Sequence, residues 1–177
     1  MEIKTERLYI RPFIKKDIDD IYEIYKDKNV CKYLLHEAWE NSDKEKEFDK
    51  KIQNNELSEN SLLSLAVVLN DKVIGDISVW YTEMRETVEI GFVFNPKFSK
   101  KGYARESVYA VISKLFDNYK VHRIQANLDA RNTPSAKLCE NLGMRREAHF
   151  IKDYWNKGEW TDSFVYGMLI TDKKKNK

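Results

Sequence analysis

Three apolar segments that follow one another with only short polar breaks limit the fold of this chain more than any other feature. Residues 62–69, 72–81 and 87–94 are rich in valine, leucine and isoleucine, and each has the length of a strand. Asn70-Asp71 separates the first two, and such a pair favours a tight β-turn. Strands joined this closely pair antiparallel, so we expect a β-meander at the centre of the fold.

The rest of the chain mixes helical spacing with further strand-like segments. We expect strands at 7–11, 122–128, 147–154 and 163–170, and helices at 17–25, 43–57, 103–119 and 134–142. Consecutive strands followed by strand–helix alternation predict an α/β (α+β) fold. Its sheet would be mixed, mostly antiparallel and built of about seven strands, with helices on both faces.

Length and charge exclude several classes of protein. A chain of 177 residues can bury one core, and we expect a single domain over residues 1–177. The 31 Lys+Arg minus 29 Asp+Glu leave +2, too even a balance for a generally basic nucleic-acid binder. Residues 1–7 lack the apolar stretch expected of a signal peptide, and no apolar run approaches the roughly 20 residues that span a bilayer. Cys31 and Cys139 match no metal-ligand spacing and no disulfide framework. We therefore expect a cytoplasmic protein with no metal site, nucleic-acid partner or membrane contact.

The third strand of the meander is joined to the long helix by a short basic loop. Helix N-termini present free N–H groups and a positive dipole end, and both favour anions such as pyrophosphate. Lys97, Lys100, Lys101 and Arg105 add charge there, and Gly102 allows close backbone approach. An ordinary strand–loop–helix connection with solvated lysines explains the same residues.

A second strand-to-helix junction spans residues 129–138 and carries Asn132 and Ser135. Such residues often only cap a helix or form a turn. If the two strands were adjacent and parallel, however, both helix N-termini would meet at one sheet edge, where open sheets bind ligands.

Four motifs carry a resemblance to a known family. They are Thr5-Glu6-Arg7-Leu8-Tyr9-Ile10-Arg11-Pro12, Glu89-Ile90-Gly91, Lys101-Gly102-Tyr103-Ala104, and Asn132-Thr133-Pro134-Ser135 running on to Leu142-Gly143-Met144. In this order they resemble the GNAT superfamily of acetyl-CoA-dependent N-acetyltransferases, over almost the whole chain. The first motif looks like the opening strand of the RimJ/RimL branch, which acetylates ribosomal-protein N-termini.

The resemblance implies acetyl-CoA (coenzyme A) as cofactor and a sheet that splays between its fourth and fifth strands. It assigns the pantetheine arm to Phe92, Val93, Phe94 and Asn132, and the pyrophosphate to Ser99, Lys100, Lys101, Gly102, Tyr103, Ala104 and Arg105, with Lys137 nearby. Ser99 and Lys100 depart from the family pattern, whereas Gly102 and Ala104 keep its small residues.

The resemblance also implies direct attack of an amine on the thioester in a ternary complex. Glu89 occupies the position of a proposed general base, although a structural ion pair would explain it equally well. Ser135 stands where the branch offers a proton donor to the leaving thiolate. Cys139 lies on an apolar helical pattern, so we interpret it as a core residue rather than a nucleophile.

Acceptor contacts are expected from aromatic and acidic loops, because these suit a cationic amine. The candidates are Tyr33, His36, Trp39, Tyr81 and Tyr154; simple packing explains Trp39 equally well. The expected acceptor is the α-amine of a protein. The alternatives are a polyamine such as spermidine, an aminoglycoside, or a non-catalytic acetyl-CoA sensor. Monomer and homodimer both stay open.

Overall fold

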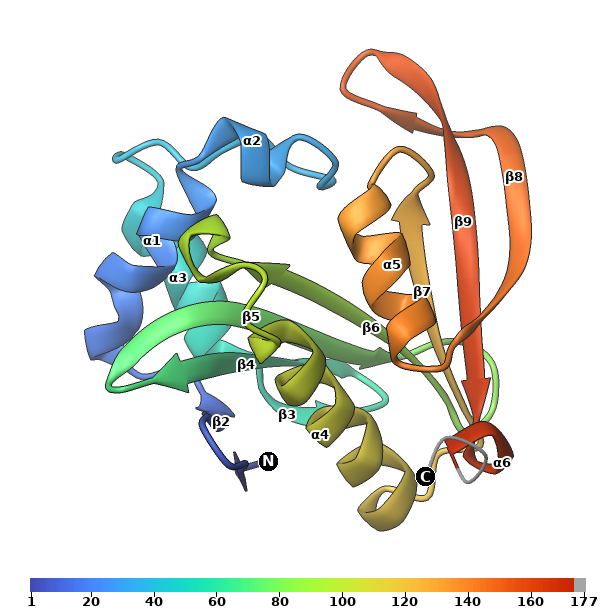
Figure 1. Ribbon diagram of the computed structural model, residues 1–177. Helices are drawn as coiled ribbons and strands as arrows, with labels where there is room; N and C mark the ends of the chain where they lie inside the picture. Colours follow the sequence, from blue (N-terminus) through green and yellow to red (C-terminus); the bar gives the residue numbers. More distant parts are fainter. Residues whose placement is uncertain (174–177) are drawn as a thin grey trace.

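A nine-stranded sheet organises residues 1–173, the part of the chain that the computed structural model describes (Figure 1). The last four residues of the expected 1–177 domain, 174–177, lie outside the described residues. The strand order is β1-β2-β4-β5-β6-β7-β9-β8, with β3 attached to β4. Only β6 and β7 pair in parallel in this described part. This mixed, mostly antiparallel sheet confirms the predicted fold class.

The elements have the following bounds. The strands are β1 (Ile3–Lys4), β2 (Tyr9–Pro12), β3 (Asn55–Ser58), β4 (Ser61–Leu69), β5 (Lys72–Tyr81), β6 (Thr87–Phe94), β7 (Arg123–Asp129), β8 (Arg145–Asn156) and β9 (Glu159–Leu169). The helices are α1 (Ile18–Tyr25), α2 (Lys28–Cys31), α3 (Lys44–Gln53), α4 (Tyr103–Asn118), α5 (Thr133–Asn141) and α6 (Ile170–Lys173), with 3-10 turns η1 (Lys15–Asp17) and η2 (Pro96–Phe98).

The central meander of β4, β5 and β6 follows the sequence prediction closely. Asn70 and Asp71 form the predicted turn with φ of 47° and 64°. Two positive φ values are what a two-residue hairpin of the right twist requires, and Asn and Asp tolerate them better than most residues. Leu63, Leu65 and Val67 face one side of β4 and are fully buried, as the alternation in a strand demands.

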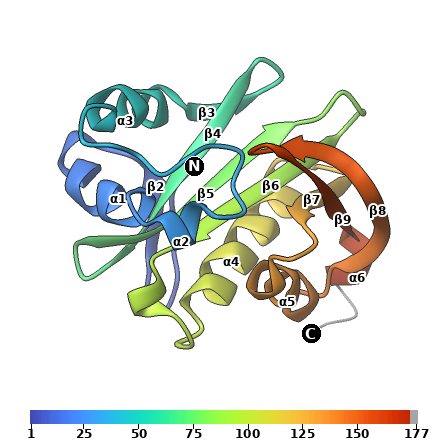
Figure 2. The same cartoon turned by 90° about the horizontal axis from the view of Figure 1, so that it is seen from above.

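Helices cover both faces of the sheet (Figure 2). α4 and α5 pack on one face, where Val108, Ile112 and Cys139 join the larger core cluster. α1 and α3 cover the other face with Ile21, Ile24 and Phe48. Within residues 1–173, no helix combines the length and apolarity needed to traverse a bilayer.

The structure differs from the sequence prediction in two short strands. The segment 7–11 was expected to be a strand, but residues 5–8 form a turn closed by the Thr5 N–H donating to the Leu8 carbonyl, so β2 begins at Tyr9 and β1 precedes it. The helix expected at 43–57 ends at Gln53, and the following residues pair with β4 as β3. Only Leu57 of β3 is buried, so this strand leaves no alternating pattern to detect.

The sheet divides between β6 and β7. The two strands pair only from Thr87 to Glu89, opposite Arg123 to Gln125. Beyond that point β6 follows β5 as far as Phe94, while β7 follows β9 as far as Asp129. The divergence confirms the expected splay, because these are the fourth and fifth strands of the predicted order.

A buried polar cluster ties α1 and α3 to β5. Asp76 is 1% exposed and forms an ion pair with Lys51. The Tyr25 hydroxyl donates to the same carboxylate oxygen at 2.7 Å. Burial and the Asp76 carboxylate raise the pKa of Tyr25, so its hydroxyl stays protonated as a donor.

Asp76→Ala should lower the free energy of unfolding by about 2–4 kcal/mol, because it leaves a half-buried cation and a buried hydroxyl without their acceptor. Lys50→Ala is the matched control, since Lys50 pairs with Glu47 on the exposed face of the same helix; its effect should stay below about 0.5 kcal/mol. Urea unfolding measures both. Equal losses for the two variants would contradict this account of the cluster.

Candidate active site

A cavity of about 580 Å³ opens where β6 and β7 separate. Five parts of the chain line it: Trp80 of β5, the separating strands β6 and β7, the N-terminus of α5, the loop after α2, and the β8–β9 hairpin. The lining residues that the sequence had singled out are Tyr33, Glu89, Phe92, Asn132, Ser135 and Tyr154. The fold therefore gathers in one place residues assigned separately to catalysis, cofactor and acceptor.

The cavity reaches both faces of the sheet. Ile90 and Phe92 point toward α4 and join the core beneath that helix. Glu89, one residue earlier, points to the opposite face beside Trp80, its cross-strand partner. A ligand from the α4–α5 side can thus meet a second ligand that arrives from the α2 side.

The Glu89 carboxylate spans the opening between the diverging strands. Its Oε2 accepts hydrogen bonds from Gln125 Nε2 at 3.0 Å and Asn127 Nδ2 at 2.6 Å. Within residues 1–173, both protein hydrogen bonds to this carboxylate end on Oε2. Glu89 is therefore oriented by two neutral amides rather than by the Arg or Lys of a structural ion pair, and Oε1 is left for a ligand or water.

The start of α5 places a hydroxyl on the other side of the cavity. Asn132 Oδ1 accepts from the Ser135 backbone N–H at 3.3 Å and caps the helix. Asn132 nevertheless lines the cavity together with Ser135, so capping and a ligand contact are compatible. The half-buried Ser135 hydroxyl can donate a proton or hydrogen bond there.

The β7-facing edge of β6 loses its ladder partner after Glu89. The strand continues through Phe92, Val93 and Phe94, all half-buried, with β5 on its other side. Backbone N–H and C=O groups on this edge need a partner. An extended ligand with its own amides can pair with such an edge.

The loop before α4 has the geometry of an anion site. Gly102 caps the helix with φ of 81°, where a Cβ would be strained, and Lys100 has φ of 61°. Glu106 N–H makes the first intrahelical hydrogen bond, to the Gly102 carbonyl, so the amides of residues 103–105 point out of the helix. Ser99, Lys100 and Lys101 are exposed around them, and Ala104 is small.

Two of the predicted phosphate cations have partners elsewhere. Lys97 forms an ion pair with Glu23 at 2.8 Å, so it fastens the loop to α1 rather than facing the anion site. Hydrogen bonds from Lys97 and Lys72 lower the pKa of Glu23 to about 2. Arg105 Nε donates to the Asn141 carbonyl at 3.3 Å, and Lys137 is exposed on α5.

The five aromatic or histidine candidates for acceptor binding separate into two groups. Tyr33 and Tyr154 line the cavity. Trp39 is 8% exposed and stacks on Tyr25 at 4.7 Å, which is the packing role that we had left open. His36 contacts the same tyrosine ring, and Tyr81 follows Trp80 and so points to the other face of β5.

Several cavity residues escaped the sequence analysis. Trp80, Phe150, Asp153 and Asn156 line the cavity beside the predicted set. Trp80 could have been found, because pairing β5 with β6 places it opposite Glu89. Strand alternation could not have identified Phe150, Asp153 and Asn156, because the pairing register of β8 with β9 shifts between Phe150 and Tyr154.

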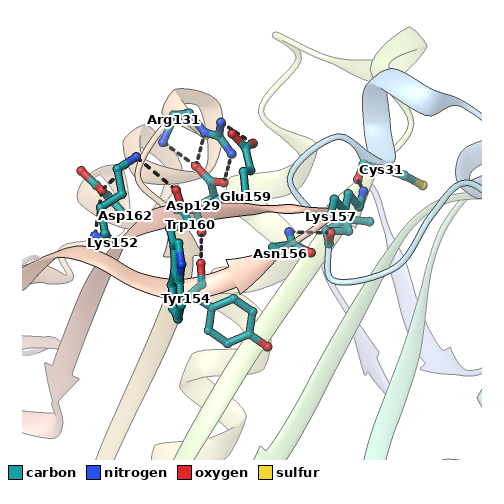
Figure 3. A network of polar contacts seen from close by, with 12 residues as sticks. Cys31, Asp129, Arg131, Lys152, Tyr154, Asn156, Lys157, Glu159, Trp160 and Asp162 are labelled. Atoms are coloured by element: carbon teal, nitrogen blue, oxygen red, sulfur yellow. Dashed lines mark hydrogen bonds and ion pairs between the residues drawn. The ribbon is translucent and has the colours of Figure 1, made fainter.

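A roof covers the α2 side of the cavity; it consists of residues 33–35 after α2, the hairpin tip 154–159, and Arg131 (Figures 1 and 3). Lys157 Nζ donates to the Cys31 carbonyl at 2.6 Å, and Asn156 Nδ2 donates to the Leu34 carbonyl at 3.3 Å. These contacts hold the hairpin tip against the end of α2.

Arg131 joins the other two parts of this roof. Its guanidinium contacts Asp129 at 2.7 Å and Glu159 at 2.8 Å, and lies 5.6 Å from the centre of the Tyr33 ring. Its planar fork allows this set of contacts, which a lysine could not reproduce. The Arg131 guanidinium thereby compensates the negative charge of Asp129 from within the same loop.

The cysteines are poorly suited to covalent catalysis. Burial raises the pKa of Cys139 to about 12 and that of Cys31 to about 11. A nucleophilic cysteine needs the opposite shift. The described residues also contain no group of His, Cys, Asp and Glu side chains that could hold a metal ion.

A divided sheet, a helix N-terminus after β6 that favours an anion, and a cavity lined by Glu89 and Ser135 fit the acetyl-CoA-dependent N-acetyltransferases that the sequence resembles. The family model described as "Acetyltransferase (GNAT) domain" matches residues 7–145. The chain belongs to the GNAT acetyltransferase family.

Two relatives resemble the chain over nearly its whole length. An uncharacterized N-acetyltransferase of Bacillus subtilis (strain 168), YnaD, is 36% identical, with 96% of this chain and 97% of that protein covered. The crystal structure of a GNAT-family acetyltransferase from Bacillus anthracis is 35% identical, with a TM-score of 0.85 and 96% and 98% of the two chains covered.

More distant relatives have named acceptors or bound coenzyme A. The spermidine N-acetyltransferase of Vibrio cholerae, solved with CoA and spermine, has a TM-score of 0.78 at 20% identity, covering 95% of this chain and 98% of its own. RimL, an α-N-acetyltransferase of ribosomal L7/L12 solved with coenzyme A, has a TM-score of 0.83 at 14% identity, covering 96% and 98%. At these identities the likeness shows the fold alone. The Escherichia coli (strain K12) [ribosomal protein uS5]-alanine N-acetyltransferase is 30% identical over 47% of this chain and 43% of its own.

Ser135→Ala should lower kcat by about 10²-fold with any acceptor that supports thiol release, since it removes the hydroxyl that would protonate the leaving sulfur. The KM for acetyl-CoA should change little. Thr133→Ala, in the same exposed first turn of α5, is the control and should retain turnover. A Ser135→Ala enzyme with wild-type kcat would remove Ser135 from the chemistry.

Proposed function

We propose that this enzyme acetylates the α-amine at the N-terminus of a protein or peptide, with acetyl-CoA as donor. The Glu89 environment carries the proposal. Two amides occupy Oε2, which leaves one carboxylate oxygen for the acceptor. A carboxylate is a weak base, and an α-amine of pKa near 8 needs only a weak base or a water relay. A polyamine or lysine amine has a pKa near 10.4 and needs more help from a base to lose its proton at neutral pH.

The other walls of the acceptor side favour a ligand with one positive charge. Arg131 compensates Asp129, so Glu89 and Asp153 remain as the cavity carboxylates able to attract cations. Tyr33, Trp80 and Tyr154 supply flat, largely neutral surfaces that suit the side chain and peptide groups of an N-terminal residue. A polyamine carries several cations and would call for more carboxylates.

The proposed reaction is direct attack. The neutral amine attacks the thioester carbonyl, forming the C–N bond while the C–S bond breaks. The amine proton leaves to Glu89 Oε1 or to a water held there. The Ser135 hydroxyl donates to the departing sulfur and relays a proton to it from water, so that the hydroxyl is restored. The free edge of β6 and Asn132 hold the pantetheine arm, and the loop 99–105 with Lys137 holds the pyrophosphate. Acetyl-CoA supplies the activated acetyl group.

The names of the relatives support both acceptor classes. The uS5 enzyme acts on an alanine of a ribosomal protein, the L7/L12 enzyme is an α-N-acetyltransferase of a protein, and the Vibrio cholerae enzyme acts on spermidine. In this chain, the aromatic surfaces and the small number of free carboxylates on the acceptor side favour a protein N-terminus over a polyamine.

A thiol-release assay with acetyl-CoA, run against N-terminal peptides, spermidine and aminoglycosides, tests the acceptor. We expect kcat/KM for the best peptide to exceed that for spermidine by at least about tenfold at pH 7.5, where much less of the polyamine is neutral. A spermidine value above that of every peptide would favour the polyamine class. CoA binding without turnover of any amine would indicate a sensor.

A further inference from the structure

The Thr5-Glu6-Arg7-Leu8 motif lies against the start of α4, about one hundred residues later in the chain. Arg7 Nη1 donates to the Lys101 carbonyl at 2.9 Å. Arg7 Nε and Nη2 contact one oxygen of Glu106 at 2.7 and 2.6 Å, and the Arg7 backbone N–H donates to the other at 3.1 Å. The guanidinium also lies 4.6 Å from the centre of the Tyr103 ring. One side chain thus contacts three residues of the anion-binding loop and helix.

The contact with Lys101 fixes the orientation of a peptide group in the anion site. In a planar trans peptide, the C=O and the following N–H point in opposite directions. Because the Lys101 carbonyl is held toward Arg7, the Gly102 N–H is directed away from Arg7. The positive φ of Gly102 then leads directly into the first turn of α4, whose free amides complete the site.

The contact with Glu106 removes an unfavourable charge. A carboxylate in the first turn would repel an incoming pyrophosphate and would weaken the positive end of the helix dipole for other anions. Thr5 Oγ1 donates to Glu106 at 2.5 Å, and Arg7 supplies a compensating full charge. Despite burial, which acts in the other direction, these hydrogen bonds lower the pKa of Glu106 and keep it an ionised partner for Arg7.

We propose that Arg7 is a positioning residue for coenzyme A. It holds the Lys101–Gly102 peptide in the anion-binding orientation and cancels the charge of Glu106 beside the pyrophosphate. The proposal concerns residues outside the acceptor side of the cavity, so it is independent of which amine is acetylated.

The test is isothermal titration of the full chain with CoA, which needs neither an acceptor nor turnover. Arg7→Gln should raise the Kd for CoA by about tenfold, equivalent to about 1.4 kcal/mol. In the Arg7→Gln/Glu106→Gln double variant, the uncompensated carboxylate is gone, and CoA should bind more tightly than to Arg7→Gln alone. Arg145→Gln is the matched control: it pairs with Glu147 at the sheet edge and is 46% exposed against 41% for Arg7. Its Kd should equal that of wild type.

Two results would overturn the proposal. One is wild-type CoA affinity in a folded Arg7→Gln protein, which would show that Arg7 only holds the N-terminal segment against α4. The other is a double variant that binds no better than Arg7→Gln. If Arg7→Gln does not fold, Arg7→Lys replaces it, since a single ammonium cannot reproduce the fork to both Lys101 and Glu106. The Arg7→Lys protein should then bind CoA more weakly than wild type. Wild-type CoA affinity in this variant would likewise overturn the proposal.

Discussion

The short parallel contact between β6 and β7 is the constraint on which the site depends. After three paired positions each strand follows a different antiparallel neighbour, so the sheet must open. Opening leaves backbone groups of β6 without a ladder partner, and such groups are costly to bury unsatisfied. It also places two helix N-termini, those of α4 and α5, on the same side of the gap. A cofactor with an amide arm and a pyrophosphate meets both requirements at once.

The gap between β6 and β7 also gives the proposed cofactor and the proposed acceptor separate approaches to the cavity, one from each face of the sheet. Alternation along β6 sends Glu89 to the α2 face and Phe92 to the α4 face, and Ser135 approaches from α5. The proposed base and the proposed acid therefore enter the cavity from different elements, β6 and α5. The amides of Gln125 and Asn127 orient Glu89 without adding a charge to the acceptor side.

Much of this could be predicted from the sequence, because local patterns determine it. The meander, the helices that follow it and the divided sheet came from periodicity, turn residues and the family resemblance. The partners of individual side chains could not be predicted, because they depend on which elements the fold brings together and not on local sequence pattern. Lys97 looked like a phosphate ligand but pairs with Glu23 from α1. For Trp39 the sequence left acceptor contact and packing equally open, and the fold packs it on Tyr25. The roof depends on Arg131 and on a hairpin whose register shift hides its alternation.

Hydrogen exchange with and without CoA measures the central claim most directly. If the unpaired edge of β6 receives the pantetheine arm and the loop before α4 receives the pyrophosphate, amides in residues 90–94 and 99–105 should gain protection when CoA is added. Amides of β9, which pairs on both sides, should not change. Unchanged exchange along β6 at saturating CoA would contradict the claim that this divided sheet is the cofactor site.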